Sequence, residues 1–249
     1  MRLLLTGLNG TLAPKLARAA VARGWEVAGW DRARVDPEDA AAADAFLAAA
    51  RPDAIAHLAF GAEGWAARLA AFAAGRGVPF LFTSTAMVFD HDPDGPHRPH
   101  DARTARDDYG RYKIRCEDAV RAASPAAVIA RIGWQIDPDA NGNNMLAQLE
   151  RWQLETGRVA ASRLWRPATS FMADTAAALL DLIADPVPGP VHLDSNAGEG
   201  HGFDRVALAL KAAFGRDGWV VAEEDGYRHD QRLLGHAERM PPLSARLPL

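Results

Sequence analysis

The sequence predicts an α/β fold built on a doubly wound parallel sheet. Three observations predict it: apolar runs alternate with helix-forming stretches over residues 1–137, a glycine-rich turn follows the first run, and an acidic residue ends the second. Repeated strand–helix units of this kind imply a parallel sheet with helices on both faces. The alternation then breaks. We therefore expect a first domain at residues 1–160 and a small C-terminal substrate lobe at 161–249, whose segments can interleave.

The predicted elements follow in a regular order, and glycines end several of the helices. Strands are predicted at residues 2–6, 25–31, 51–60, 78–89 and 127–136, and helices at 12–23, 43–50, 64–77 and 109–123. The later part of the chain adds helices at 145–157, 169–185 and 203–215 and a short strand at 189–195.

The opening stretch, MRLLLTGLNGTLAPKLARAAVARGWEVAGWD, predicts a dinucleotide-binding turn. Gly7, Gly10 and Ala13 have the spacing G-x-x-G-x-x-A between a short strand and a helix. Glycine is needed where the backbone takes a positive φ or approaches a pyrophosphate, whereas the third position needs only a small residue. The helix N-terminus then offers free N–H groups and a positive dipole end to a phosphate. The expected sheet is therefore Rossmann-type.

The end of the second strand bears on the choice of dinucleotide. Asp31 follows the glycines by about 20 residues, where an acid accepts hydrogen bonds from the adenosine ribose hydroxyls. Arg32 and Arg34 come directly after it and could meet a 2′-phosphate instead. Both NADP and NAD therefore remain open as the cofactor.

Composition excludes several classes of protein. A net charge of −4 gives no basic surface for nucleic acid or for an anionic membrane. A single cysteine, Cys116, excludes an intramolecular disulfide and suits a reducing compartment. The first apolar run is too short for a secretory signal, which needs about 7–15 apolar residues, and no run approaches the roughly 18 residues of a membrane span. We expect a cytoplasmic protein that binds a small-molecule substrate and neither nucleic acid nor membrane.

A tyrosine and a lysine follow the fourth predicted strand. Tyr109 and Lys113 are four residues apart and share one face of a helix. A tyrosine, with an ordinary pKa of about 10, is a poor acid or base at neutral pH, and a nearby ammonium lowers that pKa. The tyrosine can then give a proton to a carbonyl oxygen as hydride reaches its carbon. Thr85, at the end of the fourth strand, would hold the substrate oxygen.

These motifs resemble the extended short-chain dehydrogenase/reductases, and most closely the dTDP-4-dehydrorhamnose reductase group. TGLNGTLA is similar to that group's TGxxGxLG, STAMVFD to its STDYVFDG and YGRYKIRCE to its YGxTKxxGE. The resemblance implies reduction of a keto group, on a nucleotide-linked sugar, by hydride transfer from NADP or NAD with the tyrosine as proton donor. It makes Thr85, Tyr109 and Lys113 the catalytic set. The expected substrate-binding residues are Ala86, Met87, Trp134 and Asn144. The expected cofactor-binding residues are Gly7, Asn9, Gly10, Thr11, Leu12, Asp31, Arg32, Leu58, Ala59, Thr83, Tyr109 and Lys113.

Departures from the family pattern leave alternatives open. The family's Asp and Tyr after the catalytic Thr are Ala86 and Met87 here. Only residues 61–77 separate the third and fourth strands, so a longer segment with an Asn of the proton relay is missing. One alternative is a non-catalytic regulatory subunit that binds the cofactor or a nucleotide sugar. Another is an epimerase of the same fold, and a homodimer is also open.

Two acidic loops, residues 90–101 and 137–148, nearly have the spacing of a calcium-binding loop. Neither has the bidentate Glu in the twelfth place, and each follows a strand rather than a helix. Turn chemistry explains both loops. We therefore expect no metal site.

Overall fold

The computed structural model describes residues 1–139 and 142–249, so Ala140 and Asn141 of the second acidic loop lie outside the described residues. The chain divides into two compact units that interleave along the sequence. Unit 1 comprises Met1–Ser84, Asp107–Arg131 and Ala176–Val191, and unit 2 comprises Thr85–Arg106, Ile132–Thr175 and His192–Leu249. The predicted boundary at residue 160 therefore does not separate the two units, because each unit contains three segments of the chain. Within the described part of the chain, no helix is both long and apolar enough to cross a membrane.

Unit 1 is built on a six-stranded sheet with the order β10-β5-β4-β3-β1-β2. In sequence order the strands are β1 (Arg2–Thr6), β2 (Glu26–Gly29), β3 (Ala54–His57), β4 (Phe80–Thr85), β5 (Val128–Ile132) and β10 (Gly189–Leu193). The pairs β1–β2, β1–β3 and β3–β4 are parallel. Short, almost wholly buried strands such as LLL and AIAH are typical of a sheet covered on both faces. The predicted doubly wound parallel sheet is confirmed.

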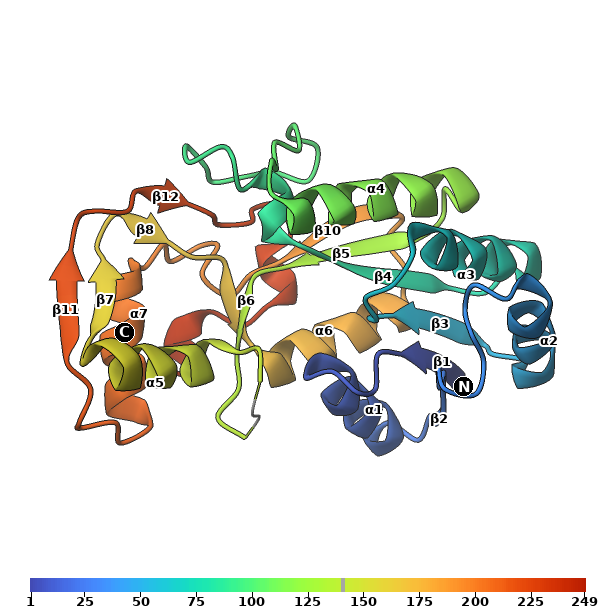
Figure 1. Cartoon of the computed structure of the whole chain (residues 1–249), viewed down its shortest axis with the longest axis horizontal. Coiled ribbons are helices and arrows are strands. Elements are labelled where there is room, and N and C mark those ends of the chain that lie inside the picture. Colours follow the sequence, from blue (N-terminus) through green and yellow to red (C-terminus); the bar gives the residue numbers. More distant parts are fainter. Residues whose placement is uncertain (140–141) are drawn as a thin grey trace. The chain divides into compact units, whose positions relative to one another are not determined.

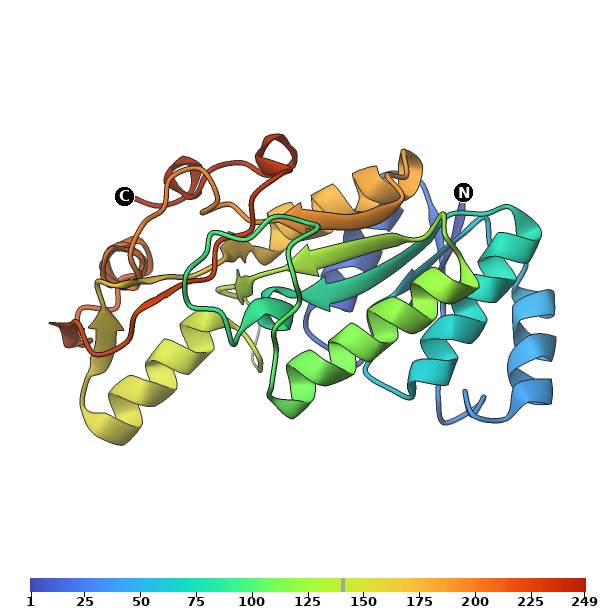
Figure 2. The ribbon, with the colours of Figure 1, turned by 90° about the horizontal axis from the view of Figure 1, so that it is seen from above.

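Helices cover both faces of this sheet. Helices α2 (Ala40–Ala50), α3 (Glu63–Arg76) and α4 (Asp108–Ala123) lie on one face, and α1 (Leu12–Ala22) and α6 (Met172–Ala184) lie on the other (Figure 1). Figure 2 shows the same division from above. The first face is filled by aromatic and aliphatic side chains from the three helices and the strands beneath them, including Trp30, Leu47, Trp65, Leu69 and Phe82. On the other face, Arg23 after α1 forms an ion pair with Asp181 of α6.

The described residues of unit 2 form two helices, three short helical turns and small parallel sheets. Its elements are η1 (Ala86–Phe89), β6 (Trp134–Ile136), α5 (Met145–Thr156), β7 (Val159–Ser162), β8 (Trp165–Arg166), β9 (Thr169–Phe171), α7 (Phe203–Ala213), β11 (Val221–Glu224), β12 (His229–Asp230), η2 (Ala237–Arg239) and η3 (Leu243–Ala245). The strands pair as β6–β9, β7–β11 and β8–β12. A separate apolar core joins α5, α7 and the C-terminal segment.

Several predicted elements were wrong in extent, and the strand predicted at 51–60, for example, covers only Ala54–His57. The strand predicted at 127–136 is two strands, because Gly133 approaches the carbonyl of Ala168 so closely that a Cβ would lie 2.2 Å from that oxygen. The chain bends there, and β6 pairs with β9 instead of continuing beside β4. That pairing also uses residues 169–171, so the helix predicted from 169 begins at Met172. The strand predicted at 78–89 ends at Thr85, whose Oγ1 accepts the N–H of Met87 and starts η1.

Candidate active site

The turn after β1 has the geometry that its glycines predict. Gly7 has φ +85°, and a Cβ on it would lie 2.9 Å from the backbone nitrogen of Ala59. The N–H of Gly10 donates to the carbonyl of Gly7 at 2.8 Å and closes the turn. Because β1 lies between β2 and β3, this turn stands where the strand order reverses, which is the usual ligand position in such sheets. Glycine is therefore needed at position 7 for two reasons: the backbone has a positive φ, and it approaches the loop after β3 too closely for a side chain.

The start of α1 fits a phosphate. Thr11 precedes the helix and makes no side-chain cap hydrogen bond, and Asn9 and Gly10 of the turn are exposed. Leu12 begins the helix, and Ala13 is buried against the sheet as the third small residue of the motif. A helix start of this kind presents backbone N–H groups and the positive end of the dipole. The residues present therefore fit the pyrophosphate of a dinucleotide.

A buried pair that the sequence analysis missed joins β1 to β3. Thr6 Oγ1 lies 2.8 Å from Nδ1 of His57 and accepts the backbone N–H groups of Leu58 and Ala59 at 3.1 Å. Because that oxygen already accepts two hydrogen bonds, its own proton goes to the histidine nitrogen. Burial, with the positive Lys113 nearby, lowers the pKa of His57 to about 3. The neutral histidine therefore orients the Thr6 hydroxyl, whose oxygen holds the loop of Leu58 and Ala59, two of the predicted cofactor-binding residues.

Asp31 and Arg32 lie in an exposed turn after β2. Asp31 Oδ1 accepts the N–H of Ala33 at 2.9 Å, and Arg32 donates to the carbonyl of Phe60 at 3.1 Å. The turn is thus ordered by side chains that keep most of their polar surface in solvent. Both side chains can meet a ribose or its 2′-phosphate, so the geometry fits either dinucleotide.

Lys113 is held at the carboxyl end of β4. Its side chain is only 6 % exposed, and Nζ donates to the carbonyl of Thr83 at 2.9 Å. The same nitrogen lies 6.0 Å from the ring centre of Tyr109, so the two residues share a face of α4 as the spacing predicts. Burial lowers the pKa of Lys113 to about 8, against the opposing effect of Cys116 and Glu117.

Only one of the two tyrosines on this part of α4 has an exposed ring. The Tyr112 hydroxyl donates to the carbonyl of Gly61 at 2.8 Å and accepts the N–H of that residue at 3.2 Å. Burial raises the pKa of Tyr112 well above its ordinary value. Tyr109, in contrast, is 44 % exposed. Tyr112 is therefore structural, and Tyr109 is the residue able to meet a substrate.

Three of the predicted substrate and catalytic positions lie where β4 passes into η1. Thr85 Oγ1 accepts the N–H of Met87 at 3.2 Å, which leaves the hydroxyl able to donate its own proton. Ala86 is buried and Met87 is half-buried. These three residues belong to unit 2, although they follow Ser84 of unit 1 directly in the chain.

The two remaining substrate positions also lie in unit 2 and differ in kind. Trp134, on β6, is half-buried in an aromatic group with Trp152, Trp165 and Phe203, at centroid distances of 6.0–6.2 Å. Asn144 is buried, and its Oδ1 accepts the N–H of Ala147 as the N-cap of α5. The structure thus explains Asn144 by helix capping, whereas Trp134 is only half-buried.

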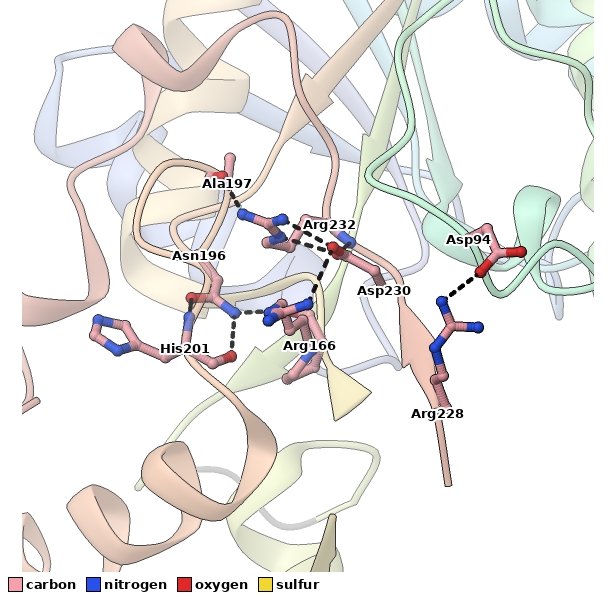
Figure 3. A network of polar contacts seen from close by, with 9 residues as sticks. Asp94, Arg166, Asn196, Ala197, His201, Arg228, Asp230 and Arg232 are labelled. Atoms are coloured by element: carbon pink, nitrogen blue, oxygen red, sulfur yellow. Dashed lines mark hydrogen bonds and ion pairs between the residues drawn. The ribbon is translucent and has the colours of Figure 1, made fainter. Parts of the chain in front are cut away.

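A charged network in unit 2 was also missed from the sequence. Arg232 binds both carboxylate oxygens of Asp230 at 2.8–2.9 Å, with Arg166 3.8 Å from the same carboxylate, and Arg228 pairs with Asp94 (Figure 3). Asp230 and Asp94 also pair through their backbones. The pocket beside this network is lined by two arginines, Arg166 and Arg228, and by two aspartates, Asp94 and Asp230, so its charged lining residues balance. The network fixes the acidic loop to the segment around β12.

A third missed group is a buried triad in unit 1. Ser84, Glu117 and Arg131 lie on β4, α4 and β5 and are at most 4 % exposed. The sequence does carry a signal for it, because Glu117 is four residues after Lys113 on the same helix face.

Among residues 1–139 and 142–249, no group of three or more His, Cys, Asp or Glu residues could hold a metal ion.

Comparisons with known proteins place the chain in a family. The profile described as RmlD substrate binding domain matches residues 1–213. The chain belongs to this family. It is 30 % identical over 217 residues to the dTDP-4-dehydrorhamnose reductase of Mycobacterium tuberculosis, which covers 79 % of this chain and 70 % of the relative. The resemblance drawn from the sequence is therefore confirmed.

Solved structures share the fold at lower identity. The dTDP-4-dehydrorhamnose reductase of Bacillus anthracis, in complex with NADP, superposes with a TM-score of 0.80 at 17 % identity, covering 98 % of this chain and 96 % of that one. The Bordetella bronchiseptica enzyme WbmH, in complex with NAD⁺, gives 0.76 at 18 % identity, covering 98 % and 95 %. The Rossmann-type architecture is thus shared with structures that hold either dinucleotide.

Proposed function

We propose that this chain reduces a keto group on a nucleotide-linked sugar, with NADPH or NADH as the hydride donor. One observation carries the proposal: a buried Lys113, bound to the end of β4, lies under an exposed Tyr109 on the same helix face. The family and the reductase relative support this reaction class.

The cofactor is assigned to unit 1. Gly7, Gly10 and the start of α1 would hold the pyrophosphate, and Asp31 with Arg32 would meet the adenosine ribose. Leu58 and Ala59, fixed by Thr6, would line the dinucleotide from β3. When bound, the nicotinamide supplies or accepts hydride. The geometry of Gly7 supports this assignment, since a side chain there would displace the loop that forms the opposite wall.

The proton chemistry is assigned to Tyr109, Lys113 and Thr85. Tyr109 gives its hydroxyl proton to the carbonyl oxygen of the substrate as hydride reaches the carbon. The ammonium of Lys113 stabilises the phenolate that remains. Thr85 donates a hydrogen bond to the same substrate oxygen, since its own oxygen is already held by the N–H of Met87.

The sugar is assigned to unit 2, with Trp134 against it. The aromatic group around Trp134 gives its half-buried ring a fixed support, and an aromatic ring suits the apolar face of a sugar or a base. Ala86 and Met87 replace two polar residues of the family pattern, so we expect the substrate to differ from the rhamnose precursor at the groups that meet them. A cytoplasmic location and a homodimer stay predictions from the sequence.

A non-catalytic regulatory subunit is the second candidate, favoured by Ala86 and by the short segment between β3 and β4. An absorbance assay of nicotinamide oxidation, run with a panel of keto-sugar nucleotides, separates the two. We expect cofactor-dependent turnover on at least one of them. Binding of a dinucleotide or a nucleotide sugar without any turnover would instead support the regulatory subunit. If no dinucleotide raises the melting temperature at millimolar concentration, the reductase fails, and if no nucleotide sugar raises it either, both candidates fail.

A further inference from the structure

Helix α4 is tied to β4 at two consecutive residues. Lys113 donates to the carbonyl of Thr83 at 2.9 Å, and one helical turn later Glu117 accepts the hydroxyl of Ser84 at 2.5 Å. Both helix residues therefore face the strand end that runs into Thr85. The first tie belongs to the proposed catalytic set, whereas the second has no part in the chemistry described so far.

Glu117 is held from the other side by a buried arginine. Nε of Arg131 lies 2.9 Å from Oε1 of Glu117, and a second guanidinium nitrogen lies 2.7 Å from Oε2. Glu117 is 1 % exposed, Arg131 4 % and Ser84 3 %. A paired carboxylate in such surroundings is costly to desolvate, and it is often no more stabilising than apolar residues of the same volume. Stability alone is thus a weak reason for this triad.

The charged or titratable groups near the ammonium of Lys113 come from two elements. His57 comes from β3, and Tyr109, Tyr112, Cys116 and Glu117 come from α4. Arg131, on β5, is bound to Glu117. His57 is neutral at neutral pH because burial lowers its pKa to about 3. Burial lowers the pKa of Lys113, and Cys116 and Glu117 oppose that fall. Burial also raises the pKa of the Cys116 thiol, so at neutral pH the thiol carries no charge and Glu117 is the anion that acts.

We propose that Glu117 is a positioning residue for the reaction: clamped by Arg131 and Ser84, it fixes the end of β4 and keeps the buried ammonium of Lys113 charged beneath Tyr109. The proposal rests on the proposed function for its role in turnover. Its electrostatic part concerns the protein alone. Removing the anion and removing its cationic partner should therefore act on Lys113 in opposite directions.

The pKa of Lys113 can be measured directly in the protein without cofactor. The chain has three lysines, Lys15, Lys113 and Lys211, so NMR titration of protein labelled at lysine Cε gives few signals. The Lys113→Met variant assigns the signal of interest. We expect Glu117→Gln to lower the pKa of Lys113 by about one pH unit, because Arg131 is left uncompensated, and Arg131→Met to raise it by a similar amount.

The matched control is the exposed ion pair of Glu63 and Arg115, which also joins α4 to a neighbouring element. Glu63→Gln should leave the pKa of Lys113 within about 0.2 pH unit, since exposed charges are screened by solvent. If a single triad variant fails to fold, Glu117→Gln/Arg131→Met removes both charges. The pKa of Lys113 in this double variant should lie above that in Glu117→Gln and below that in Arg131→Met, so comparison with whichever single variant folds still tests the direction of the shift.

Opposite shifts in Glu117→Gln and Arg131→Met support the proposal, and the pH profile of turnover should move with each pKa. Shifts in the same direction, or no shift in either variant, overturn it and leave the triad a packing feature. The proposed function fails separately: if Lys113→Met turns over as fast as the parent, the lysine has no role in the reaction, whatever Glu117 does to its pKa.

Discussion

Two regions at the strand ends of unit 1 are held in contrasting ways: the ends of β1 and β3, and the end of β4. The ends of β1 and β3 are joined by neutral groups, a threonine hydroxyl, a neutral histidine and a glycine that leaves no room for a side chain. The end of β4 is held by buried charges, the ammonium of Lys113 and the carboxylate and guanidinium of Glu117 and Arg131. The first end carries the cofactor-binding positions, and the second carries the proton chemistry.

The contrast follows from what each region has to do, which is to bind the cofactor at β1 and β3 and to transfer a proton at β4. A pyrophosphate is met by backbone N–H groups, so that end requires a fixed backbone shape and gains nothing from an added charge. A proton donor requires a controlled charge nearby, and a buried ion keeps its effect because solvent does not screen it. Substitutions at the two ends should therefore separate into effects on binding and effects on turnover and its pH dependence.

The largest effect is expected at the charged end, from Tyr109→Phe. The change removes one oxygen and leaves the ring, so turnover should fall by roughly 10² to 10⁴, the range for losing a general acid, while dinucleotide affinity barely changes. Steady-state kinetics and cofactor titration measure both. Tyr112→Phe is the matched control, because that hydroxyl is bound to Gly61; it should cost stability and spare turnover. A Tyr109→Phe protein as fast as the parent would refute the assignment.

The next effect is expected at the neutral end, when the pH falls. His57 has an ordinary pKa of 6.5 and a folded pKa of about 3, so between these values the unfolded chain binds a proton that the folded protein does not. The contribution of His57 to stability is then lost as pH falls from 6.5, by about 3 kcal/mol at pH 4. The buried Asp194, whose pKa is raised to about 7, acts in the opposite direction, so the test is a difference between proteins. The change in unfolding free energy from pH 7 to pH 4, measured in urea, should be about 3 kcal/mol more destabilising in the parent and in His91→Gln, an exposed control, than in His57→Gln. Equal changes in all three proteins would count against a buried neutral histidine.

Gly7→Ala tests the shape of the cofactor end. An added Cβ would meet Ala59 at a positive φ, and strain of about 1–3 kcal/mol would weaken dinucleotide binding by roughly 10- to 100-fold. Gly24→Ala is the control, since it has a similar φ of +77° with nothing within 4 Å of the added atom. Isothermal titration should find the control unchanged in affinity. Equal weakening in both variants would mean that the positive φ, and not the contact with the loop after β3, determines the loss of dinucleotide affinity.

The smallest effect is expected at Arg32. If its guanidinium meets a 2′-phosphate, Arg32→Met should weaken NADPH by roughly three- to tenfold relative to NADH, as fits an exposed charge pair worth about 1 kcal/mol. Arg34→Met is the neighbouring control. The ratio of kcat/KM for the two dinucleotides measures the preference. An unchanged ratio would assign the adenosine ribose to Asp31 alone.

Unit 1 could be predicted from sequence far better than unit 2. Most of its strands are short and buried, and glycine or a polar residue ends or follows each one, so local patterns decide the elements. The spacing of Tyr109 and Lys113 decides their shared face. Unit 2 depends on distant contacts. The two-residue strand β8 exists because β12, far along the chain, pairs with it, and β5 ends because Gly133 meets Ala168. The triad of Ser84, Glu117 and Arg131 likewise joins three elements, so spacing reveals Glu117 but not its partners.

The most direct test of hydride transfer follows the hydride itself. A nicotinamide cofactor deuterated at its reactive carbon is incubated with the parent protein and the best keto-sugar nucleotide, and the sugar is examined by mass spectrometry. The account predicts one deuterium in each product molecule, cofactor oxidised in equal amount, and very little of either with Tyr109→Phe. Sugar converted without deuterium and without net oxidation of the cofactor would contradict it and indicate an epimerase that recycles a bound dinucleotide.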